Sequence, residues 1–375
     1  MMQMVHSRFN ALLSACVLSL IATASWSQSI TWLGTLPGFD QSYAQGVSDN
    51  GVVVGYAFNA AEQASAFRWT ASGGMQNLGG VGTVAYGVSA DGSVVVGVSV
   101  VRAFRWTASN GMQDLGTLPG GSRSEAYGVS ANGAVVVGRS YNAAARQYRA
   151  FRWTASNGMQ DLGTLPGGYY SEAYGVSADG RVVVGRADNA AGRGRVFRWT
   201  ASGGMQDLGG GGLLNSAFAV SADGSVVVGW ADGRAFRWTA SGGMHNLGTL
   251  GGIHSCAYGV SADGRVVVGW AENAARQWRA FRWTASSGLM EDLNTTYASL
   301  LTNGSELMEA RAISPNGRYI VGWGYKAGAN RPEAFLLDTG TGRSPCTLDG
   351  DVNGDGIVDD ADLLEVLFNF GSQCP

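Results

Sequence analysis

A unit of sequence recurs along most of this chain and limits the folds that the chain can adopt. Its landmark is the pattern Ser-x-Asp/Asn-Gly, and successive copies start 40 to 53 residues apart. The seven copies begin at Ser48, Ser89, Ser130, Ser177, Ser221, Ser261 and Ser314. Repeats of this length form solenoids or propellers, and the spacing suits one blade of a propeller.

Each unit predicts four β-strands. In the copy around Ser177, residues 173–177 and the β-branched residues 182–184 flank an Asp-Gly turn, which is a hairpin signal. Residues 197–200, Phe-Arg-Trp-Thr, alternate between aromatic and polar side chains and predict a third strand. A glycine pair then leads into a fourth strand at 205–208.

The number of strands distinguishes a closed ring from an open stack. The first three strands occur seven times, the last time within 310–338, but the fourth strand follows only six of them. Residues 30–34 resemble the missing strand, and pairing them beside 335–337 would leave no unpaired edge. The sequence therefore predicts an all-β fold, a seven-bladed β-propeller over residues 28–342 that is closed by its N-terminal strand.

Variation between the copies is concentrated on one face of the predicted ring. Connections alternate between the two faces because successive strands run antiparallel. The turns after the first and third strands, as at 177–180 and 200–204, hardly change, and we call their side the repeated-turn face. The other connections differ in length and content, as at 99–102 and 140–149, and lie on what we call the variable-loop face.

Variable loops on a rigid scaffold are typical of a binding surface. These loops are rich in arginine and aromatic side chains, which favour bidentate and stacking contacts with a glycan or a protein partner. The candidate ligand-binding residues are Arg146, Tyr148, Arg149, Tyr169, Tyr170, Arg193, Arg195, Arg276, Trp278 and Arg279. Loops also tolerate neutral change, so the same variation has a second interpretation that needs no ligand.

The arginine and tryptophan of the third strand recur in six units, and we interpret both as structural. The arginine lies between two aromatic residues and is expected to pair locally, while the tryptophan is expected in the core between blades. The arginines are Arg68, Arg105, Arg152, Arg198, Arg237 and Arg282. The tryptophans are Trp69, Trp106, Trp153, Trp199, Trp238 and Trp283.

The N-terminus predicts an export signal, residues 1–27. Basic side chains precede an apolar stretch at 11–22, and small residues place the cleavage after Ala24 or Ser27. The stretch is shorter than the roughly 20 residues of a membrane helix. We therefore expect a secreted, extracellular or cell-surface protein with no membrane span. A net charge of −3 without a basic block gives no indication of a nucleic-acid partner.

Oxygen-bearing side chains recur at alternate positions in the tail, residues 343–375. The expected ligands are Asp351, Asn353, Asp355, the backbone carbonyl of Ile357, Asp359 and Asp362. Such a loop, with a glycine at its sharp turn, is what Ca²⁺ requires, and residues 361–368 predict a helix after it. A polar turn without metal is the alternative interpretation.

Three cysteines remain once the signal is removed. Cys346 and Cys374 flank the calcium loop, and a disulfide between them would stabilise this small module by about 3 kcal/mol. Cys256 is then expected as a small, free core residue.

The recurring AFRWT and LGTLPGG stretches resemble the HAF family of probable extracellular repeats over residues 30–338. That resemblance implies export and repetition but no activity. Residues 348–371 resemble half of a dockerin. In the dockerin form of the calcium loop, Asp takes the last ligand position, as Asp362 does here. Dockerins bind cohesin domains through paired loops. A single loop favours a tail that anchors or sorts the protein through a cell-surface or cohesin-like partner.

Two functions are compatible with the sequence. The favoured one is a non-catalytic extracellular binding or adhesion module, and the alternative is a secreted polysaccharide hydrolase or lyase with acid and base groups at the channel mouth. Glu125 and Glu172 are the nearest carboxylate candidates, but both precede the same AYGVS motif. His254 and Cys256 have the residue types of a base and a nucleophile, but the sequence shows no third group to orient them, so they are weak evidence for catalysis. Residues 294–311 depart furthest from the repeat and would cap the channel or carry a partner site.

Overall fold

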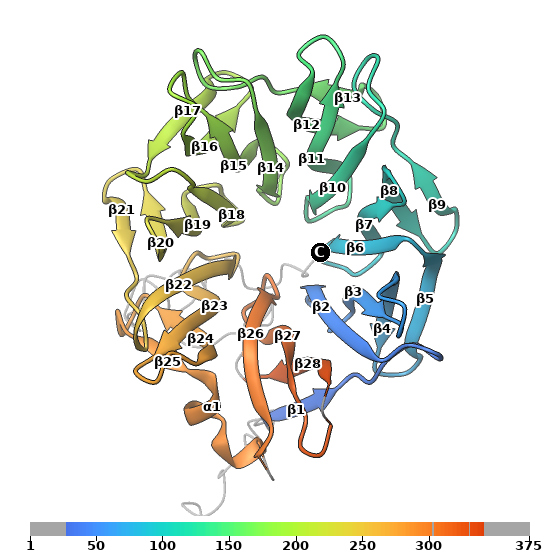
Figure 1. Cartoon of the computed structure of the whole chain (residues 1–375), viewed down its shortest axis with the longest axis vertical. Coiled ribbons are helices and arrows are strands. Elements are labelled where there is room, and N and C mark those ends of the chain that lie inside the picture. The colour runs from blue at the N-terminus through green and yellow to red at the C-terminus, as the bar shows by residue number, and fades with distance from the viewer. Residues whose placement is uncertain (1–27, 302–303, 330, 341–375) are drawn as a thin grey trace, which may run out of the picture.

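The computed structural model describes residues 28–301, 304–329 and 331–340. The strands in this part of the chain form seven antiparallel sheets of four strands each, arranged around a central opening (Figure 1). Six sheets follow the order of the chain, and the seventh takes its outer strand from the N-terminal end. The predicted seven-bladed propeller is confirmed.

The first strand of each blade lies nearest the central opening (Figure 1). These inner strands are β2 (Gln41–Val47), β6 (Thr83–Val88), β10 (Ser124–Val129), β14 (Ser171–Val176), β18 (Ser216–Val220), β22 (Gly251–Val260) and β26 (Glu306–Ile313). The second strands are β3 (Val53–Phe58), β7 (Val94–Ser99), β11 (Val135–Asn142), β15 (Val182–Asp188), β19 (Val226–Ala231), β23 (Val266–Asn273) and β27 (Tyr319–Tyr325).

The remaining two strands complete each blade toward its outer edge. The third strands are β4 (Ala64–Thr70), β8 (Arg102–Thr107), β12 (Gln147–Thr154), β16 (Gly194–Thr200), β20 (Arg234–Thr239), β24 (Trp278–Thr284) and β28 (Pro332–Asp338). The outer strands are β5 (Gly74–Val81), β9 (Gly111–Asp114), β13 (Gly158–Asp161), β17 (Gly204–Gly209), β21 (Gly243–Asn246), β25 (Met290–Asp292) and β1 (Ser29–Trp32).

The landmark motif forms the turn between the first and second strands. Ser177 Oγ donates to Asp179 Oδ1 at 2.7 Å and accepts from the backbone N–H of Val182 at 2.9 Å. Gly180 has a backbone φ of +74°, a conformation that residues with a Cβ atom rarely adopt. The motif is therefore explained by turn chemistry alone.

The backbone of this turn also joins neighbouring blades. The N–H of Ala178 donates to the carbonyl oxygen of Ala222 in the next blade at 3.0 Å, and equivalent bonds link successive blades from Asp49 to Pro315. The repeated-turn face thus carries a nearly complete ring of backbone hydrogen bonds.

A glycine follows the valines of each second strand, because the backbone of the first strand lies too close to this position to leave room for a Cβ atom. A Cβ on Gly138 would overlap the carbonyl oxygen of Glu125, at a bulge where the register shifts between Ala126 and Gly128. In the next blade, the ring of Phe197 fills the space above Gly185, since its Cε1 would lie 2.9 Å from a Cβ there. Glycine and phenylalanine are therefore a packed pair.

Phenylalanine, rather than tryptophan, occupies the centre of the core between blades. The phenylalanine of every third strand is buried, namely Phe67, Phe104, Phe151, Phe197, Phe236, Phe281 and Phe335. Among the recurring tryptophans of the described residues, Trp153 is buried and the others are half-buried at the margin of the core. The prediction of a tryptophan core was therefore only partly right.

The N-terminal strand closes the ring as the sequence predicts. β1 pairs antiparallel with β28, and Trp32 lies opposite Phe335 with ring centroids 6.2 Å apart. This pairing satisfies the edge of the last blade, so the described ends of the body are joined within one sheet.

The helical part of the segment that departs furthest from the repeat lies away from the channel. It contains α1 (Leu293–Thr296) and a 3-10 turn (Ala298–Leu300), and α1 lies at the outer rim of the ring (Figure 1). Leu293 and Tyr297 are buried against Phe335 in the core of the last two blades. The prediction that residues 294–311 cap the channel is therefore wrong for the helical part, while residues 306–311 belong to the inner strand β26.

Candidate ligand-binding face

The side chains that differ most between blades form a cross-strand pair at the end that carries the variable loops. One member precedes the motif serine by five residues, and the other follows the repeated glycine of the second strand. The strand register places the two opposite each other in every blade. The pairs are Tyr43 with Tyr56, Val84 with Val98, Glu125 with Arg139, Glu172 with Arg186, Ser216 with Trp230, Cys256 with Trp270, and Glu309 with Trp323.

The blades are more alike two residues further along the inner strand. Here the rings of Tyr86, Tyr127, Tyr174, Phe218 and Tyr258 form a row with neighbouring centroids 5.2 to 5.3 Å apart. The seventh blade has Arg311 at this position, with its guanidinium carbon 4.2 Å from the centroid of Tyr258. The strongest variation between blades is therefore at the level nearest the variable loops.

Charged side chains meet at this level between the third and fourth blades. Arg139 contacts both carboxylates, through Nη2 to Glu125 Oε1 at 2.7 Å and through Nη1 to Glu172 Oε1 at 2.5 Å. Tyr127 donates to Glu125 Oε2 at 2.6 Å, and Tyr174 donates to Glu172 Oε2. One guanidinium thus holds two carboxylates from neighbouring blades.

The environment keeps the donors of this network protonated. Burial is the largest cause that raises the pKa of Tyr127 and of Tyr174, and the neighbouring carboxylates act in the same direction. Burial alone would lower the pKa of Arg139, but Tyr127, Glu125 and Glu172 outweigh it and the pKa is raised. The network is a fixed set of ion pairs and hydrogen bonds.

The variable level of the fifth, sixth, seventh and first blades is aromatic instead. The residues after the repeated glycine are Trp230, Trp270, Trp323 and Tyr56. Trp270 stacks on Trp278 with centroids 4.7 Å apart, and 42% of Trp278 is exposed. The variable-loop face therefore has a charged part and an aromatic part.

The predicted ligand-binding residues lie on three blades of this face. Among them, the contacts bring Tyr148 and Tyr170 together, at 6.4 Å between centroids, and the guanidinium carbon of Arg139 lies 4.6 Å from the Tyr148 ring. Tyr170 also donates to Glu172, so it belongs to the charged network. Tyr169 is instead 67% exposed.

Several of the predicted arginines are already paired with carboxylates. Arg195 lies 3.0 Å from Asp207, Arg279 lies 3.1 Å from Glu306, and Arg276 lies 3.7 Å from Glu272. The remaining ones are Arg146 and Arg193, which are exposed, and Arg149, which is half-buried. The predicted arginines lie in the β11–β12, β15–β16 and β23–β24 connections or on the third strands beside them.

Sequence reasoning missed Arg139, Arg186 and the aromatic residues at the same level. They lie on strands, whereas the variation that predicts this face lies in the loops. Aligning the copies residue by residue would have found them, because the position after the repeated glycine changes while the glycine does not.

Cys256 does not have the environment of a nucleophile. It is 4% exposed, and burial raises the pKa of its thiol, which disfavours the reactive thiolate. His254, two residues earlier, is exposed and donates its backbone N–H to Glu272.

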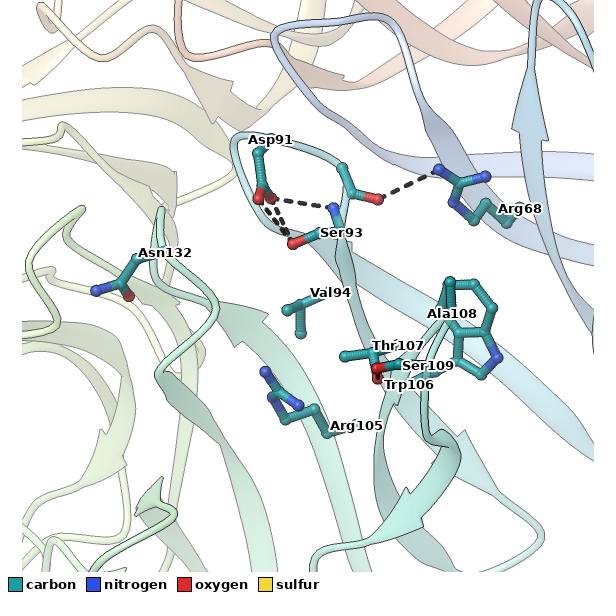
Figure 2. A pocket seen from close by; sticks show the side chains of 11 residues that line it. Arg68, Asp91, Ser93, Val94, Arg105, Trp106, Thr107, Ala108, Ser109 and Asn132 are labelled. Carbon is teal, nitrogen blue, oxygen red and sulfur yellow. Dashed lines mark hydrogen bonds between the residues drawn. The ribbon is translucent and has the colours of Figure 1, made fainter. Parts of the chain in front are cut away.

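A hollow of about 580 Å³ lies on the opposite, repeated-turn face (Figure 2). Arg68 donates to the carbonyl oxygen of Gly92 at 3.4 Å, and Asp91 accepts from Ser93 within its own turn (Figure 2). The equivalent bond from the recurring arginine to the next blade is present for Arg105, Arg152, Arg198 and Arg237. The polar groups of this hollow therefore take part in hydrogen bonds within the turns and between neighbouring blades. This agrees with the structural role expected for the recurring arginines.

The calcium ligands predicted at Asp351, Asn353, Asp355, Ile357, Asp359 and Asp362 lie outside the described residues, as do Cys346 and Cys374. The residues that the structure does describe contain no group of three or more His, Cys, Asp or Glu side chains placed to bind a metal. In that same part of the chain, no helix is long and apolar enough to cross a membrane.

Comparison with solved structures supports the fold. The β-propeller domain of Cps50 (Swd1) from Myceliophteria thermophila is similar with a TM-score of 0.52 and 11% identity, over 83% of this chain and 99% of that one. The chain is built as a β-propeller. At this level of identity the likeness shows the fold alone.

Two further solved structures are similar at lower scores. The putative TolB from Agrobacterium tumefaciens has a TM-score of 0.45 and 15% identity, over 67% of this chain and 88% of that one. TolB from Acinetobacter baumannii has a TM-score of 0.44 and 11% identity, over 71% and 63%. No protein-family model and no curated protein matches the chain.

Proposed function

We propose that this chain is an exported, non-catalytic binding or adhesion module that holds a glycan or a protein at its variable-loop face. The observation that supports this most is the difference between blades in the cross-strand pair. Neutral change in loops does not account for it, because these residues are half-buried or buried on strands, and strand positions tolerate change less than loops. The core phenylalanine of the third strand is by contrast the same in all seven blades.

We also propose a family for the repeats and roles for the two segments outside the propeller. Residues 1–27 direct export, the repeats belong with the HAF family of extracellular repeats, and the tail at 343–375 binds one Ca²⁺ through a dockerin-like loop. That tail would anchor the ring to a cell surface or a cohesin-like partner. The regular ligand spacing from Asp351 to Asp362 supports the calcium site.

The binding function is tested with the mature chain, residues 28–375, on glycan arrays and against immobilised cell-surface extracts. Trp278→Ala should weaken binding of the ligand found at least about tenfold, because Trp278 is an exposed ring on the variable-loop face. Leu289→Ala is the matched control, since Leu289 is 67% exposed on the same blade, in the turn after β24 on the repeated-turn face. Loss of binding with Leu289→Ala and not with Trp278→Ala would overturn the proposal.

The tail is tested by calcium titration of the same chain. One Ca²⁺ per chain should bind, and Asp355→Ala should abolish binding without changing the melting temperature of the ring. A chain that binds no calcium would show that the loop is a polar turn.

A polysaccharide hydrolase or lyase remains the second candidate, because the structure does bring Glu125 and Glu172 to one point. However, Arg139 stands between them with direct contacts to both, where a glycosidase needs room for the glycosidic oxygen and water. Release of reducing ends or unsaturated products by the wild-type chain, and its loss in Glu172→Gln, would reverse the order of the two candidates.

A further inference from the structure

Three arginines of the third blade have no carboxylate partner, and we call them the arginine triplet. Arg123 lies in the connection before β10, Arg146 in the turn between β11 and β12, and Arg149 on β12. Arg123 and Arg146 are exposed, while Arg149 is half-buried and its buried Nε has no hydrogen-bond partner. None of the three side chains makes an ion pair or a hydrogen bond with any residue that the structure describes.

The triplet comes from two segments that pack together on the variable-loop face. The carbonyl oxygen of Arg123 accepts from Ser140 Oγ at 3.1 Å and from the N–H of Tyr141 at 2.9 Å. Ser140 on β11 lies directly opposite Arg149 on β12, and Arg146 lies in the turn that joins these two strands (Figure 1). The three arginines therefore belong to one small part of the face.

Arg149 lacks a partner because the carboxylate next to it is held by another side chain. In the fourth blade, Arg195 and Asp207 occupy the corresponding positions and lie 3.0 Å apart. In the third blade, Asp161 replaces Asp207 but accepts from Asn142 Nδ2 at 3.0 Å. The guanidinium of Arg149 is therefore left for an anion that does not belong to the repeat.

Arg146 occupies a backbone position that favours glycine. Its φ is +53°, and the fourth blade has Gly192 at the corresponding place with a φ of +69°. The left-handed region disfavours every residue with a Cβ atom. An exposed arginine without an ion pair does not offset this cost within the described chain, so turn chemistry alone does not account for Arg146.

The carboxylates near the triplet do not neutralise it. Those of the charged network are held by Arg139, and Asp188 lies 3.3 Å from Arg186. Asp161 opposes the triplet with one negative charge against three positive charges. Arg193, on the neighbouring hairpin, is a further exposed arginine without an ion pair among the described residues. Arginines without carboxylate partners attract an anionic ligand and bind its oxygens in pairs.

The side chains around the triplet favour an acidic polysaccharide over an acidic protein. The centre of a protein interface is usually apolar. The exposed large aliphatic residues of the described chain all lie outside the third blade, and they are Val81, Val100, Leu213, Leu214, Ile253 and Leu289. The third blade therefore offers charge without an apolar anchor, which suits a hydrated polymer that carries acidic groups at regular intervals.

We propose that the arginine triplet binds the acidic groups of a polysaccharide, either the carboxylates of a uronate polymer or sulfate esters. This inference rests on the proposed binding function and names its ligand class and position. The polymer would extend beyond the triplet, so that it can also contact Trp278 on the sixth blade.

The experiment measures binding of polygalacturonate, dextran sulfate, dextran and polyglutamate to the mature chain by calorimetry. At least one of the two acidic polysaccharides should bind, and the tighter one distinguishes carboxylate from sulfate. Dextran should not bind, and polyglutamate should bind at least about tenfold more weakly. The double variant Arg123→Gln with Arg146→Gln should weaken binding at least about tenfold. Arg149→Lys should weaken it at least about threefold, because lysine keeps the charge but loses the planar fork.

Asp161→Asn changes binding in the opposite direction. It removes the opposing charge and should tighten binding about threefold. The fold accepts asparagine here, since Asn246 has the same position in the fifth blade and its Oδ1 accepts from the N–H of Gly248 at 2.8 Å. Arg181→Gln is the matched control, because Arg181 is 85% exposed on the repeated-turn face, and it should have no effect. Melting temperatures of the variants at exposed positions should remain close to that of the wild type.

Two results would contradict the inference. One is binding of an acidic polysaccharide that the double variant leaves intact; the binding function would then stand if Trp278→Ala weakens that binding. The other is that neither acidic polysaccharide binds, or that dextran or polyglutamate binds as tightly as they do. A ligand found on the glycan arrays or in the cell-surface extracts would then define a binding module of another specificity.

Discussion

The backbone N–H of Asn316 donates to Asp49 Oδ1 at 2.7 Å and completes the hydrogen-bonded ring of the repeated-turn face. At the other blade junctions, the second residue of the motif donates its own N–H to the next blade. The seventh blade has Pro315 at that position, and proline has no N–H to donate. The carboxylate of Asp49, where five other blades have alanine, accepts from the following residue instead.

Asp49→Ala should destabilise the ring by about 1 to 3 kcal/mol, because the N–H of Asn316 would lose its partner. Asp49→Asn keeps an acceptor oxygen and removes a charge. Burial raises the pKa of Asp49, so the ionised form is disfavoured in the fold and the amide should be tolerated at pH 7. Urea unfolding of both variants checks this, and equal losses in the two would contradict it.

The fold could be predicted from the sequence because the spacing and the number of the repeats indicate how the strands are arranged. Seven motif copies and one displaced fourth strand determine both the number of blades and the closure by residues 30–34. The burial of phenylalanine over tryptophan could not be predicted in this way. Period-two alternation places Phe197 and Trp199 on the same face, but it does not show that Gly185 leaves space for the phenylalanine ring.

The candidate face could be predicted only in part. Loop variation predicted a binding surface on the variable-loop face and included Trp278 and Tyr170. The bridge from Arg139 to Glu172 depends on how one blade packs against the next, which spacing along a single chain does not show. The contact between Tyr43 and Trp323 depends in the same way on the seam between the first and last blades.

Arg139 should be important for stability as well as for the face. Arg139→Met would leave Glu125 and Glu172 without their shared partner, and removing one side of a buried ion pair costs about 3 to 5 kcal/mol. Arg139 is 25% exposed, so we expect the lower end of that range. Thermal and urea unfolding measure the loss.

Arg181→Met provides the control, because Arg181 is 85% exposed in its pair with Asp179 and should change stability by less than about 0.5 kcal/mol. Adding Glu172→Gln to Arg139→Met should restore part of the lost stability by removing one unpaired charge. A double variant less stable than Arg139→Met would contradict the assignment.

The tyrosines of the ring should make the fold sensitive to alkali. Burial raises the pKa of Tyr86 and of Tyr43 to about 12, whereas a tyrosine in the unfolded chain titrates near pH 10. The unfolded chain loses these protons first, so stability is complete below about pH 10 and falls as pH rises toward 12. Urea midpoints between pH 8 and 11.5 should show this decline.

Tyr86→Phe should make the alkaline decline shallower, because it removes one of the shifted groups. The absorbance of tyrosinate should appear together with unfolding. Tyrosines of the folded chain that all titrate near pH 10, with no change in the urea midpoint, would show that the rings are not protected.

Cys256 offers a test of burial and of the predicted tail disulfide in one measurement. Its thiol is 4% exposed and burial raises its pKa, so the native chain should react with iodoacetamide at pH 8 at least about tenfold more slowly than the unfolded chain. Mass spectrometry of mature protein unfolded without reductant should then show one labelled cysteine, Cys256. Cys346 and Cys374 should be labelled only after reduction, since a disulfide protects both. Three labelled cysteines without reductant would disprove the bond, and rapid labelling of Cys256 in the native chain would mean that the seam between the last two blades opens in solution.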